Sequence, residues 1–309
     1  MRGQSTVERF SSDARGQLHR LGTRPKKGLG QHFLIDRSVL EKILTAAELE
    51  PSDTVIEVGP GLGILTAELA KRAGKVIAIE VDSGLASSLQ KRLSKFANLT
   101  VINTDILQLD PQELIDRKKN YKVVANLPYY IAAPILRHFL EASRKPNIMV
   151  VMVQKEVGQS IVAAPGDMSI LGISVQLYGK PAIVDYVSAQ SFHPQPKVDS
   201  AIVRIDVYSK PAVDVKDIAG FFEIVKAGFS APRKQIRNSL ALGLQLTAAE
   251  AEELLQKAGI KSQRRPETLS LEEWAKLHRT FSGNVEVGAR LPRPETLKGK
   301  LTGNARLSP

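Results

Sequence analysis

The chain has 309 residues, contains no cysteine and carries a formal net charge of +11. These features exclude disulfide bonds, thiolate metal sites and a cysteine nucleophile, and no apolar run approaches the roughly 20 residues of a membrane-spanning helix. The positive charge suits binding to nucleic-acid phosphates, although it does not by itself distinguish RNA from DNA, an anionic membrane or simple solubility.

Residues 1–27 are polar and basic, and we expect them to form a flexible arm. They lack the apolar core of a secretory signal, which favours a cytoplasmic protein. A helix should follow, because Ser38 and Glu41 have the spacing of a capping box and precede apolar residues at helical spacing. Pro51 should end this helix.

Strands and helices then alternate up to residue 207. The expected strands are Thr54–Val58, Lys75–Val81, Leu99–Ile102, Tyr121–Ala125, Ile148–Val153, Ala182–Val187 and Ala201–Val207. The expected helices are Leu65–Arg72 with Gly74 as its stop, Ser83–Phe96, a short one after Asp110, Pro134–Glu141 and Ile170–Tyr178. This alternation predicts an α/β fold with a mainly parallel sheet. The last two strands lack a crossover helix and should form an antiparallel edge pair.

From residue 209 the pattern is helical only. The expected helices are Ile218–Phe229, Lys234–Leu244, Ala248–Ala258 and Leu271–Thr280. Two of them begin with capping-box spacing, at Thr247/Glu250 and Ser270/Glu273. We therefore divide the chain into an arm (1–27), an α/β domain (28–208), a small all-α domain (209–284) and a disordered, Gly/Pro/Arg-rich tail (285–309).

Two signals indicate a nucleotide-like cofactor. Residues 57–63 form a glycine-rich turn between a strand and a helix, where the backbone can approach a ligand closely. Glu80 ends the next strand and can accept hydrogen bonds from both ribose hydroxyls. Alternatively, Glu80 is a solvated strand end and Asp82 caps the following helix. These signals fit NAD and S-adenosylmethionine equally.

A third signal favours S-adenosylmethionine. Asp105 follows the third strand, where its carboxylate can accept from an adenine amine, and Asn126-Leu127-Pro128-Tyr129 follows the fourth. The N6 amine of adenine is a poor nucleophile because its lone pair is delocalised into the ring. The Asn126 side-chain oxygen and the Leu127 carbonyl can accept its two N–H groups and localise that lone pair. The Tyr129 ring offers a surface on which the base can stack, contributing about 1–3 kcal/mol.

With these residues the chain resembles the small-subunit ribosomal RNA adenine dimethyltransferases, the family whose bacterial members confer kasugamycin sensitivity. The resemblance covers roughly residues 24–280. It is carried by the stretches Lys27–Leu34, Glu57–Gly63, Asn126–Tyr129, Gln154–Val157, Ser191–Ser200 and Arg233–Leu240. It implies a Rossmann-like class I methyltransferase sheet followed by a small helical RNA-binding domain.

The resemblance also implies roles for individual residues. The implied contacts to S-adenosylmethionine are His32, Leu34, Gly59 for the methionine moiety, Glu80 for the ribose, Asp105 for the adenine amine, and Asn126 at the reacting centre. His32 stands where many family members carry Asn. Phe192 is implied to be a second stacking ring that faces Tyr129 across the base. Alone, a Phe before a Pro-rich loop more often fills a core, but beside Asn126 and Tyr129 we favour stacking.

The implied substrate is a pair of adjacent adenosines in a hairpin loop near the 3′ end of small-subunit ribosomal RNA, within the pre-30S particle. Unpaired loop bases splay out at low cost. The RNA should contact a set of basic residues, namely Lys26, Lys27, Arg233, Lys234, Arg237, Arg264 and Arg265. We expect a monomer.

Three alternatives remain. A macrolide-resistance methyltransferase would use the same chemistry on large-subunit RNA, and the stretch Pro196–Ser200 favours the small-subunit enzymes. A non-catalytic assembly factor would not need the set at 126–129. A dehydrogenase is the most distant alternative.

Overall fold

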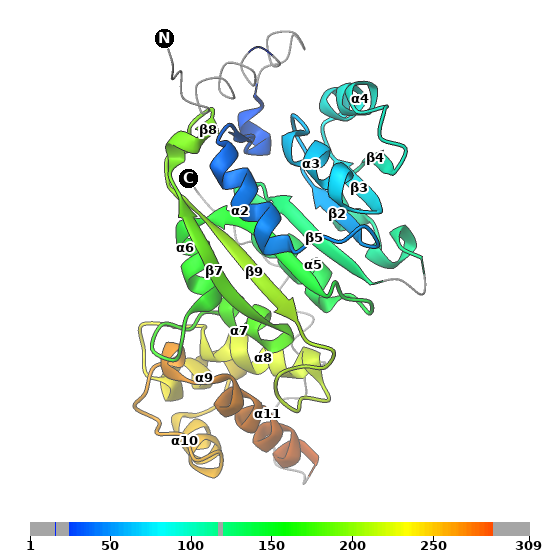
Figure 1. Cartoon of the computed structure of the whole chain (residues 1–309). Helices are drawn as coiled ribbons and strands as arrows, with labels where there is room; N and C mark the ends of the chain where they lie inside the picture. The colour runs from blue at the N-terminus through cyan, green and yellow to red at the C-terminus, as the bar shows by residue number, and fades with distance from the viewer. Residues whose placement is uncertain (1–15, 17–24, 117–119, 287–309) are drawn as a thin grey trace. The chain divides into compact units, whose positions relative to one another are not determined.

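The computed structural model describes residue 16 and residues 25–116 and 120–286, so most of the predicted arm and tail lie outside the described residues. The chain forms two compact units. The first comprises the described residues up to Val162 together with Ser174–Lys210 and is α/β (Figure 1). The second comprises Ala163–Ile173 and the described residues from Pro211 and is α-helical. Segment 163–173 thus joins the helical unit, which the sequence pattern did not indicate.

A seven-stranded sheet forms the centre of the first unit, as described. Its order is β4 (Leu99–Asn103), β3 (Lys75–Glu80), β2 (Thr54–Val58), β5 (Tyr121–Asn126), β6 (Ile148–Gln154), β9 (Ser200–Val207) and β7 (Gly179–Val187). Strands β2 to β6 pair in parallel, and β9 is antiparallel to both of its neighbours. The α/β class with its antiparallel C-terminal strands is therefore confirmed.

The two C-terminal strands occupy positions that chain order alone did not predict. They pair with each other as expected, but β9 lies between β6 and β7, so β7 alone of the pair is at the edge. The reason is visible in their side chains. Ala201, Ile202 and Val203 of β9 are all fully buried, whereas β7 is buried only at its two ends and alternates between exposed and half-buried positions in between.

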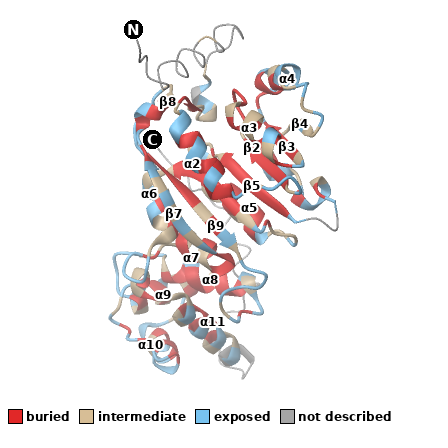
Figure 2. Ribbon diagram, viewed as in Figure 1, coloured by how far each residue is buried: buried red, intermediate tan, exposed pale blue. Residues whose placement is uncertain are grey.

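Helices accompany the strands in chain order. They are α2 (Arg37–Ala47), α3 (Ile64–Arg72), α4 (Ser83–Arg92), α5 (Ala132–Glu141), α6 (Lys155–Val162) and, from Ser174 on, the larger part of α7 (Ile170–Tyr178). Figure 2 shows their buried faces and the buried central strands that form the core of this unit. The helix α6 was not predicted. A short 3-10 helix, η3 (Pro111–Leu114), follows Asp110, which caps it by accepting from the backbone N–H of Gln112.

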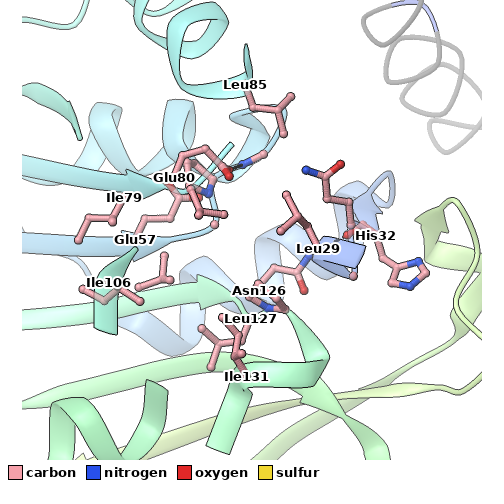
Figure 3. Close-up of a pocket in the computed structure, with 18 of the residues that line it drawn as sticks. Leu29, His32, Glu57, Ile79, Glu80, Leu85, Ile106, Asn126, Leu127 and Ile131 are labelled. Atoms are coloured by element: carbon pink, nitrogen blue, oxygen red, sulfur yellow. Dashed lines mark hydrogen bonds between the residues drawn. The ribbon is translucent and has the colours of Figure 1, made fainter. Parts of the chain in front are cut away.

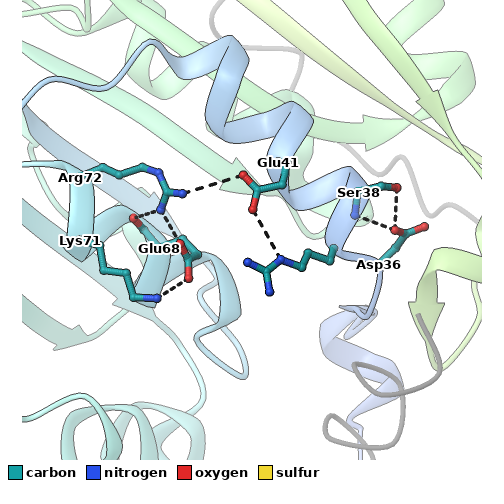
Figure 4. Close-up of polar contacts among 7 residues, drawn as sticks. Asp36, Ser38, Glu41, Glu68, Lys71 and Arg72 are labelled. Carbon is teal, nitrogen blue, oxygen red and sulfur yellow. Dashed lines mark hydrogen bonds and ion pairs between the residues drawn. The ribbon is translucent and has the colours of Figure 1, made fainter. Parts of the chain in front are cut away.

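The start of α2 differs from the predicted capping box. Asp36 is the N-cap, and its carboxylate accepts from the backbone N–H of Ser38 at 2.9 Å (Figure 4). Glu41 does not reach back to the cap. Instead it forms ion pairs with Arg37 at 3.7 Å and, across to α3, with Arg72 at 3.9 Å. Asp36 can serve as the N-cap in place of Ser38 because Asp and Ser are similarly favourable at this position.

The C-terminus of α2 is held by two cations from the sheet. The Lys122 ammonium donates to the backbone carbonyls of Ala47 at 3.2 Å and Glu48 at 2.5 Å, and pairs with Asp53 at 2.9 Å. Arg204 of β9 donates to the carbonyl of Ala46 at 2.8 Å. Cations are favourable here because the last carbonyls of a helix lack intrahelical partners.

The second unit contains α8 (Ile218–Gly228), α9 (Ile236–Leu244), α10 (Ala248–Lys257) and α11 (Leu271–Glu286). Both predicted capping boxes are confirmed, at Thr247/Glu250 and at Ser270/Glu273. Trp274 is fully buried and stacks on Phe229, with ring centroids 5.7 Å apart. No helix among the described residues is long and apolar enough to cross a membrane.

We expect Lys122→Met to lower the free energy of unfolding by about 3 kcal/mol, because it leaves Asp53 without its buried partner. Chemical denaturation at neutral pH measures the change. Lys42→Met is the matched control, since the Lys42–Asp185 pair is exposed (48% and 37%) and should contribute no more than about 1 kcal/mol. Equal losses in the two variants would contradict a special role for Lys122.

Candidate active site

A pocket lies at the carboxyl ends of β2, β3 and β5, covered on one side by the segment around β1 (Phe33–Leu34) (Figure 3). Ligand sites of open parallel sheets are found at this edge. Of the residues that the sequence singled out, those that line the pocket are His32, Leu34, Gly59, Glu80, Asp105, Asn126, Leu127 and Tyr129. Phe192 is not among the lining residues. The fold thus brings together eight of the nine predicted residues.

The glycine-rich turn after β2 is built on positive backbone angles. Gly61 has φ 54° and Gly63 has φ 73°, a region that other residues rarely adopt. A Cβ atom at Gly61 would lie 3.0 Å from the Phe33 ring, and one at Gly63 would lie 2.2 Å from a Leu89 methyl. The turn therefore requires glycine for both its backbone and its packing.

Glu80 is a buried carboxylate, not a solvated strand end. It is 4% exposed, and its oxygens accept from the backbone N–H groups of Gly61 at 3.0 Å and Asp82 at 2.9 Å. Burial raises the pKa of Glu80, and these two donors partly oppose that rise. Each oxygen keeps a second lone pair for a ligand. Asp82 caps α4, as the alternative interpretation proposed, by accepting from Gly84 and Leu85.

Glu57 is the most deeply buried acid of the pocket. It is 1% exposed, and its Oε2 has no hydrogen-bond partner. Burial raises the pKa of Glu57 to about 8; the nearby Thr66 hydroxyl opposes the rise, and the Glu80 carboxylate adds to it. The Glu57 carboxyl is therefore mainly protonated at neutral pH until a cation or a donor reaches it. The sequence pattern had indicated no role for Glu57 beyond the turn.

Asn126 ends β5 with its carboxamide held in one orientation. Its Nδ2 donates to the backbone carbonyl of His32 at 3.1 Å, which leaves Oδ1 as the atom that can accept from a ligand. The backbone of Leu127 is fixed by its N–H, which donates to the carbonyl of Met152 at 3.0 Å. The predicted pair of acceptors, Asn126 Oδ1 and the Leu127 carbonyl, therefore sits at a rigid strand end.

Tyr129 opens the 3-10 helix η4 (Tyr129–Ile131) and is held at two points. Its hydroxyl lies 2.6 Å from the Ser200 Oγ, and its ring stacks on the His32 imidazole with centroids 5.6 Å apart and planes at 25°. Burial raises the pKa of Tyr129, which keeps the hydroxyl protonated. The Tyr129 ring thus has a defined plane in the pocket.

Phe192 is buried and is not among the pocket-lining residues, so its expected stacking against the base stays a prediction. It is 2% exposed and belongs to a core cluster that includes Leu34 and Leu40. The cause is the antiparallel pairing of β1 with β8 (Phe192–His193), which places Phe192 opposite Leu34. In this arrangement its ring fills the core, the alternative noted above.

Several residues that the sequence analysis did not single out as contacts complete the pocket edge. Gln31 lines it and donates to the Asp82 carboxylate at 3.2 Å. Lys26, which was expected to contact RNA, pairs with the same carboxylate at 3.0 Å. The apolar side chains Val81, Leu107 and Tyr130 line it while remaining 51%, 37% and 54% exposed. Exposed apolar groups at a pocket edge are a signal only once the fold is known.

The predicted basic set is partly used within the protein. Arg264 of the second unit donates to the Glu273 carboxylate and the Thr268 carbonyl, and Arg237 lies 3.4 Å from Glu252. Arg233 and Lys234 are exposed. The side chain of Lys27 lies outside the described part of the structure.

A family model and a curated relative both match this chain, and they agree on its family. Residues 22–280 match the model of the family described as ribosomal RNA adenine dimethylase. The chain is 51% identical to ribosomal RNA small subunit methyltransferase A of Dehalococcoides mccartyi over 259 residues, which covers 84% of this chain and 89% of that protein.

Two solved structures extend the comparison. A dimethyladenosine transferase from Plasmodium falciparum superposes with a TM-score of 0.70 at 26% identity, covering 82% of this chain and 98% of that one. The 23S rRNA methyltransferase ErmE superposes with a TM-score of 0.63 at 30% identity, covering 81% and 99%.

We expect Glu57→Gln to flatten the pH dependence of stability in the protein without ligand. Because the pKa of Glu57 is raised in the folded state, the folded protein binds more protons than the unfolded chain between pH 4.5 and about 8, and stability falls as pH rises through this window. The glutamine variant should therefore exceed the wild type in free energy of unfolding by a margin that grows from pH 5 to pH 8. Urea denaturation across this range measures it, and a margin that shrinks would refute the assignment.

We expect Phe192→Ala to lower the free energy of unfolding by about 3–5 kcal/mol, because it empties a core position. Phe192→Leu should largely preserve both stability and methyl-transfer turnover, since it fills most of the volume without an aromatic face. Tyr129→Leu is the comparison variant. It should slow turnover about fivefold or more, the equivalent of losing about 1–3 kcal/mol of stacking. A large loss of turnover in Phe192→Leu with stability intact would restore the stacking role.

Proposed function

Since the chain belongs to the ribosomal RNA adenine dimethylase family, we propose that it dimethylates two adjacent adenosines in the 3′-terminal hairpin loop of small-subunit ribosomal RNA. It is an S-adenosylmethionine-dependent enzyme that methylates adenine in ribosomal RNA. The finer parts of the proposal are the hairpin site, action on the pre-30S particle in the cytoplasm and a monomeric enzyme. The observation that carries it is the rigid pair of acceptors at Asn126 and Leu127 beside the Tyr129 ring.

The pocket residues fit S-adenosylmethionine. The unpartnered Oε2 of the buried Glu57 can accept from, or neutralise, a cationic ligand. Glu80 would hold the ribose hydroxyls and Asp105 the adenine amine, while the exposed apolar faces of Val81 and Leu107 suit a flat purine. His32, Leu34 and Gly59 would complete the contacts. When bound, the cofactor supplies an electrophilic methyl group.

The chain's own residues then act on the adenine. Asn126 Oδ1 and the Leu127 carbonyl would accept the two N6 hydrogens and bring the lone pair of the amine into reach. Tyr129 would hold the base by stacking. Catalysis is then mostly positioning, and no strong general base is required. Both acceptors are neutral, so they orient the amine without carrying a charge themselves.

The RNA would be held by exposed cations outside the pocket. Arg233, Lys234 and Arg265 of the second unit are candidates for contacts to phosphates. Arg264 is excluded from this proposal because its guanidinium is committed to Glu273 and Thr268.

The alternative substrate is an adenine in large-subunit RNA, because the chain is also 30% identical to a 23S rRNA methyltransferase. The greater identity of 51% to a small-subunit methyltransferase supports our choice. Incubation with labelled cofactor and undermethylated small or large subunits, followed by mapping of the modified nucleotides, decides between them. Label confined to large-subunit RNA would refute the proposed substrate.

We expect Asn126→Ala to abolish methylation while cofactor affinity stays near the wild-type value, because the substitution removes an acceptor for the substrate amine. Labelled methyl transfer and calorimetric cofactor binding measure the two effects separately. Asn147→Ala is the control, since Asn147 is exposed at the amino edge of β6, away from the pocket. A parallel loss of binding and transfer in Asn126→Ala would mean that Asn126 supports the fold and not the reaction.

A further inference from the structure

The segment Lys26–Gln31, which we call the strap, covers one side of the pocket just before β1. Leu29, Gly30 and Gln31 of the strap line the pocket, and Figure 3 labels Leu29. The strap is folded on itself. The backbone N–H of Lys26 donates to the Gln31 side-chain oxygen at 2.8 Å, and the backbone N–H of Leu29 donates to the Lys26 carbonyl at 3.0 Å. It therefore forms a compact turn at the edge of the pocket.

The protein holds the strap less firmly than the strand that follows it. Phe33 and Leu34 of β1 are 7% and 8% exposed, and both pair with residues of β8. The described side chains of the strap, in contrast, are exposed or half-buried. Segments with few buried apolar contacts open at a low cost in free energy. The strap can therefore move while β1 stays in place.

One carboxylate connects the strap to the opposite side of the pocket. Asp82 pairs with the Lys26 ammonium at 3.0 Å and accepts from Gln31 Nε2 at 3.2 Å. Asp82 itself is 6% exposed, caps α4, and donates its backbone N–H to Glu80 at 2.9 Å. The Lys26 side chain is 56% exposed, so water and salt reach its end of the ion pair. The bond thus joins a fixed acid to a movable cation.

The proposed reaction requires repeated exchange of the cofactor. Each cofactor molecule supplies one methyl group, and dimethylation of an adenosine consumes two of them. The spent cofactor must therefore leave, and a fresh one must enter, between transfers. Buried wall residues such as Glu57, Glu80 and Leu127 lie at strand ends and cannot move without disturbing the core. The strap is a wall that can open without this cost.

We propose that the strap is the gate for cofactor exchange and that the Lys26–Asp82 ion pair is its latch. Opening the strap exposes the pocket, so breaking the latch should speed both entry and exit of the cofactor. A residue that only contacted the bound cofactor would change exit alone. Lys26 does not line the pocket, which makes it a clean probe of the strap. The inference deepens the proposed function and rests on it for the need to exchange the cofactor.

The test uses Lys26→Met in the full chain, with Lys71→Met as the matched control. Lys71 lies in the same unit, is 53% exposed, pairs with Glu68 at 2.6 Å and does not line the pocket. Both variants lose one exposed positive charge and one ion pair. Stopped-flow binding of S-adenosylhomocysteine, measured without RNA, gives the association and dissociation rates.

We expect Lys26→Met to raise both rates about fivefold, the upper end of what an ion pair with an exposed partner contributes. Because both rates rise together, affinity should change less than about twofold. Lys26→Arg should restore the wild-type rates, since it keeps the charge. Added sodium chloride should speed exchange in the wild type but not in Lys26→Met, because salt screens an exposed charge pair.

Amide hydrogen exchange supplies a readout that needs no cofactor. The Leu29 N–H, which donates within the strap, should exchange faster in Lys26→Met than in the wild type and at the wild-type rate in Lys71→Met. Equal protection of Leu29 in all three proteins would overturn the proposal. Unchanged binding rates in Lys26→Met, a rise in dissociation alone, or the same changes in Lys71→Met would also overturn it. Methylation of a different RNA by the wild type would count against the proposed function and leave these expected rates as they are.

Discussion

The hydrogen bond from Asn126 Nδ2 to the His32 carbonyl joins two segments 94 positions apart and sets the polarity of the site. A carboxamide can present either an N–H or an oxygen to a ligand. With one N–H of its amino group bonded to the His32 carbonyl, Asn126 has its oxygen available as an acceptor. A substrate amine needs hydrogen-bond acceptors, so this bond favours a ligand that carries an amine. It holds only while the β1–β8 ladder, which also buries Phe192, keeps residue 32 beside β5.

The pocket is built from groups that do not favour folding. Glu57 and Glu80 are acids with raised pKa values in a low-dielectric environment, and the turn between them uses glycines at positive φ. The stability that offsets these costs lies elsewhere in the same unit. The apolar strands form the core, and Lys122 and Arg204 secure the end of α2, whose start at Asp36 directly follows the segment that covers the pocket. A destabilised binding edge on a well-packed sheet is a common arrangement in enzymes.

Patterns of residue spacing predicted the structural features that depend on residues close together in the chain. The alternation of strands and helices, the capping boxes at Thr247 and Ser270 and the convergence of the carboxyl ends on one pocket all follow from spacing along the chain. Long-range pairing was not visible in the same way. The strands β1 and β8 are two residues each, too short to carry a periodic signal, yet their pairing buries Phe192 and brings His32 to Tyr129. Helix α6 was missed because it is only eight residues long and includes Gly158, a residue unfavourable in helix interiors; a Cβ there would lie 2.8 Å from that of Ala201.

The site separates its charges from its acceptors in a way that suits two very different ligands. Acids occupy the end formed by β2, β3 and η2 (Ile106–Gln108), where Glu57 and Glu80 are buried and Asp105 is half-buried. Neutral groups occupy the end formed by β5, where an amide oxygen, a carbonyl and aromatic rings meet. A cationic cofactor gains from the first end. A polyanionic RNA, attracted by a chain of net charge +11, meets only neutral groups at the second. Because Glu57 and Glu80 are buried and their pKa values are raised, they place little negative charge at the opening that the phosphates must approach.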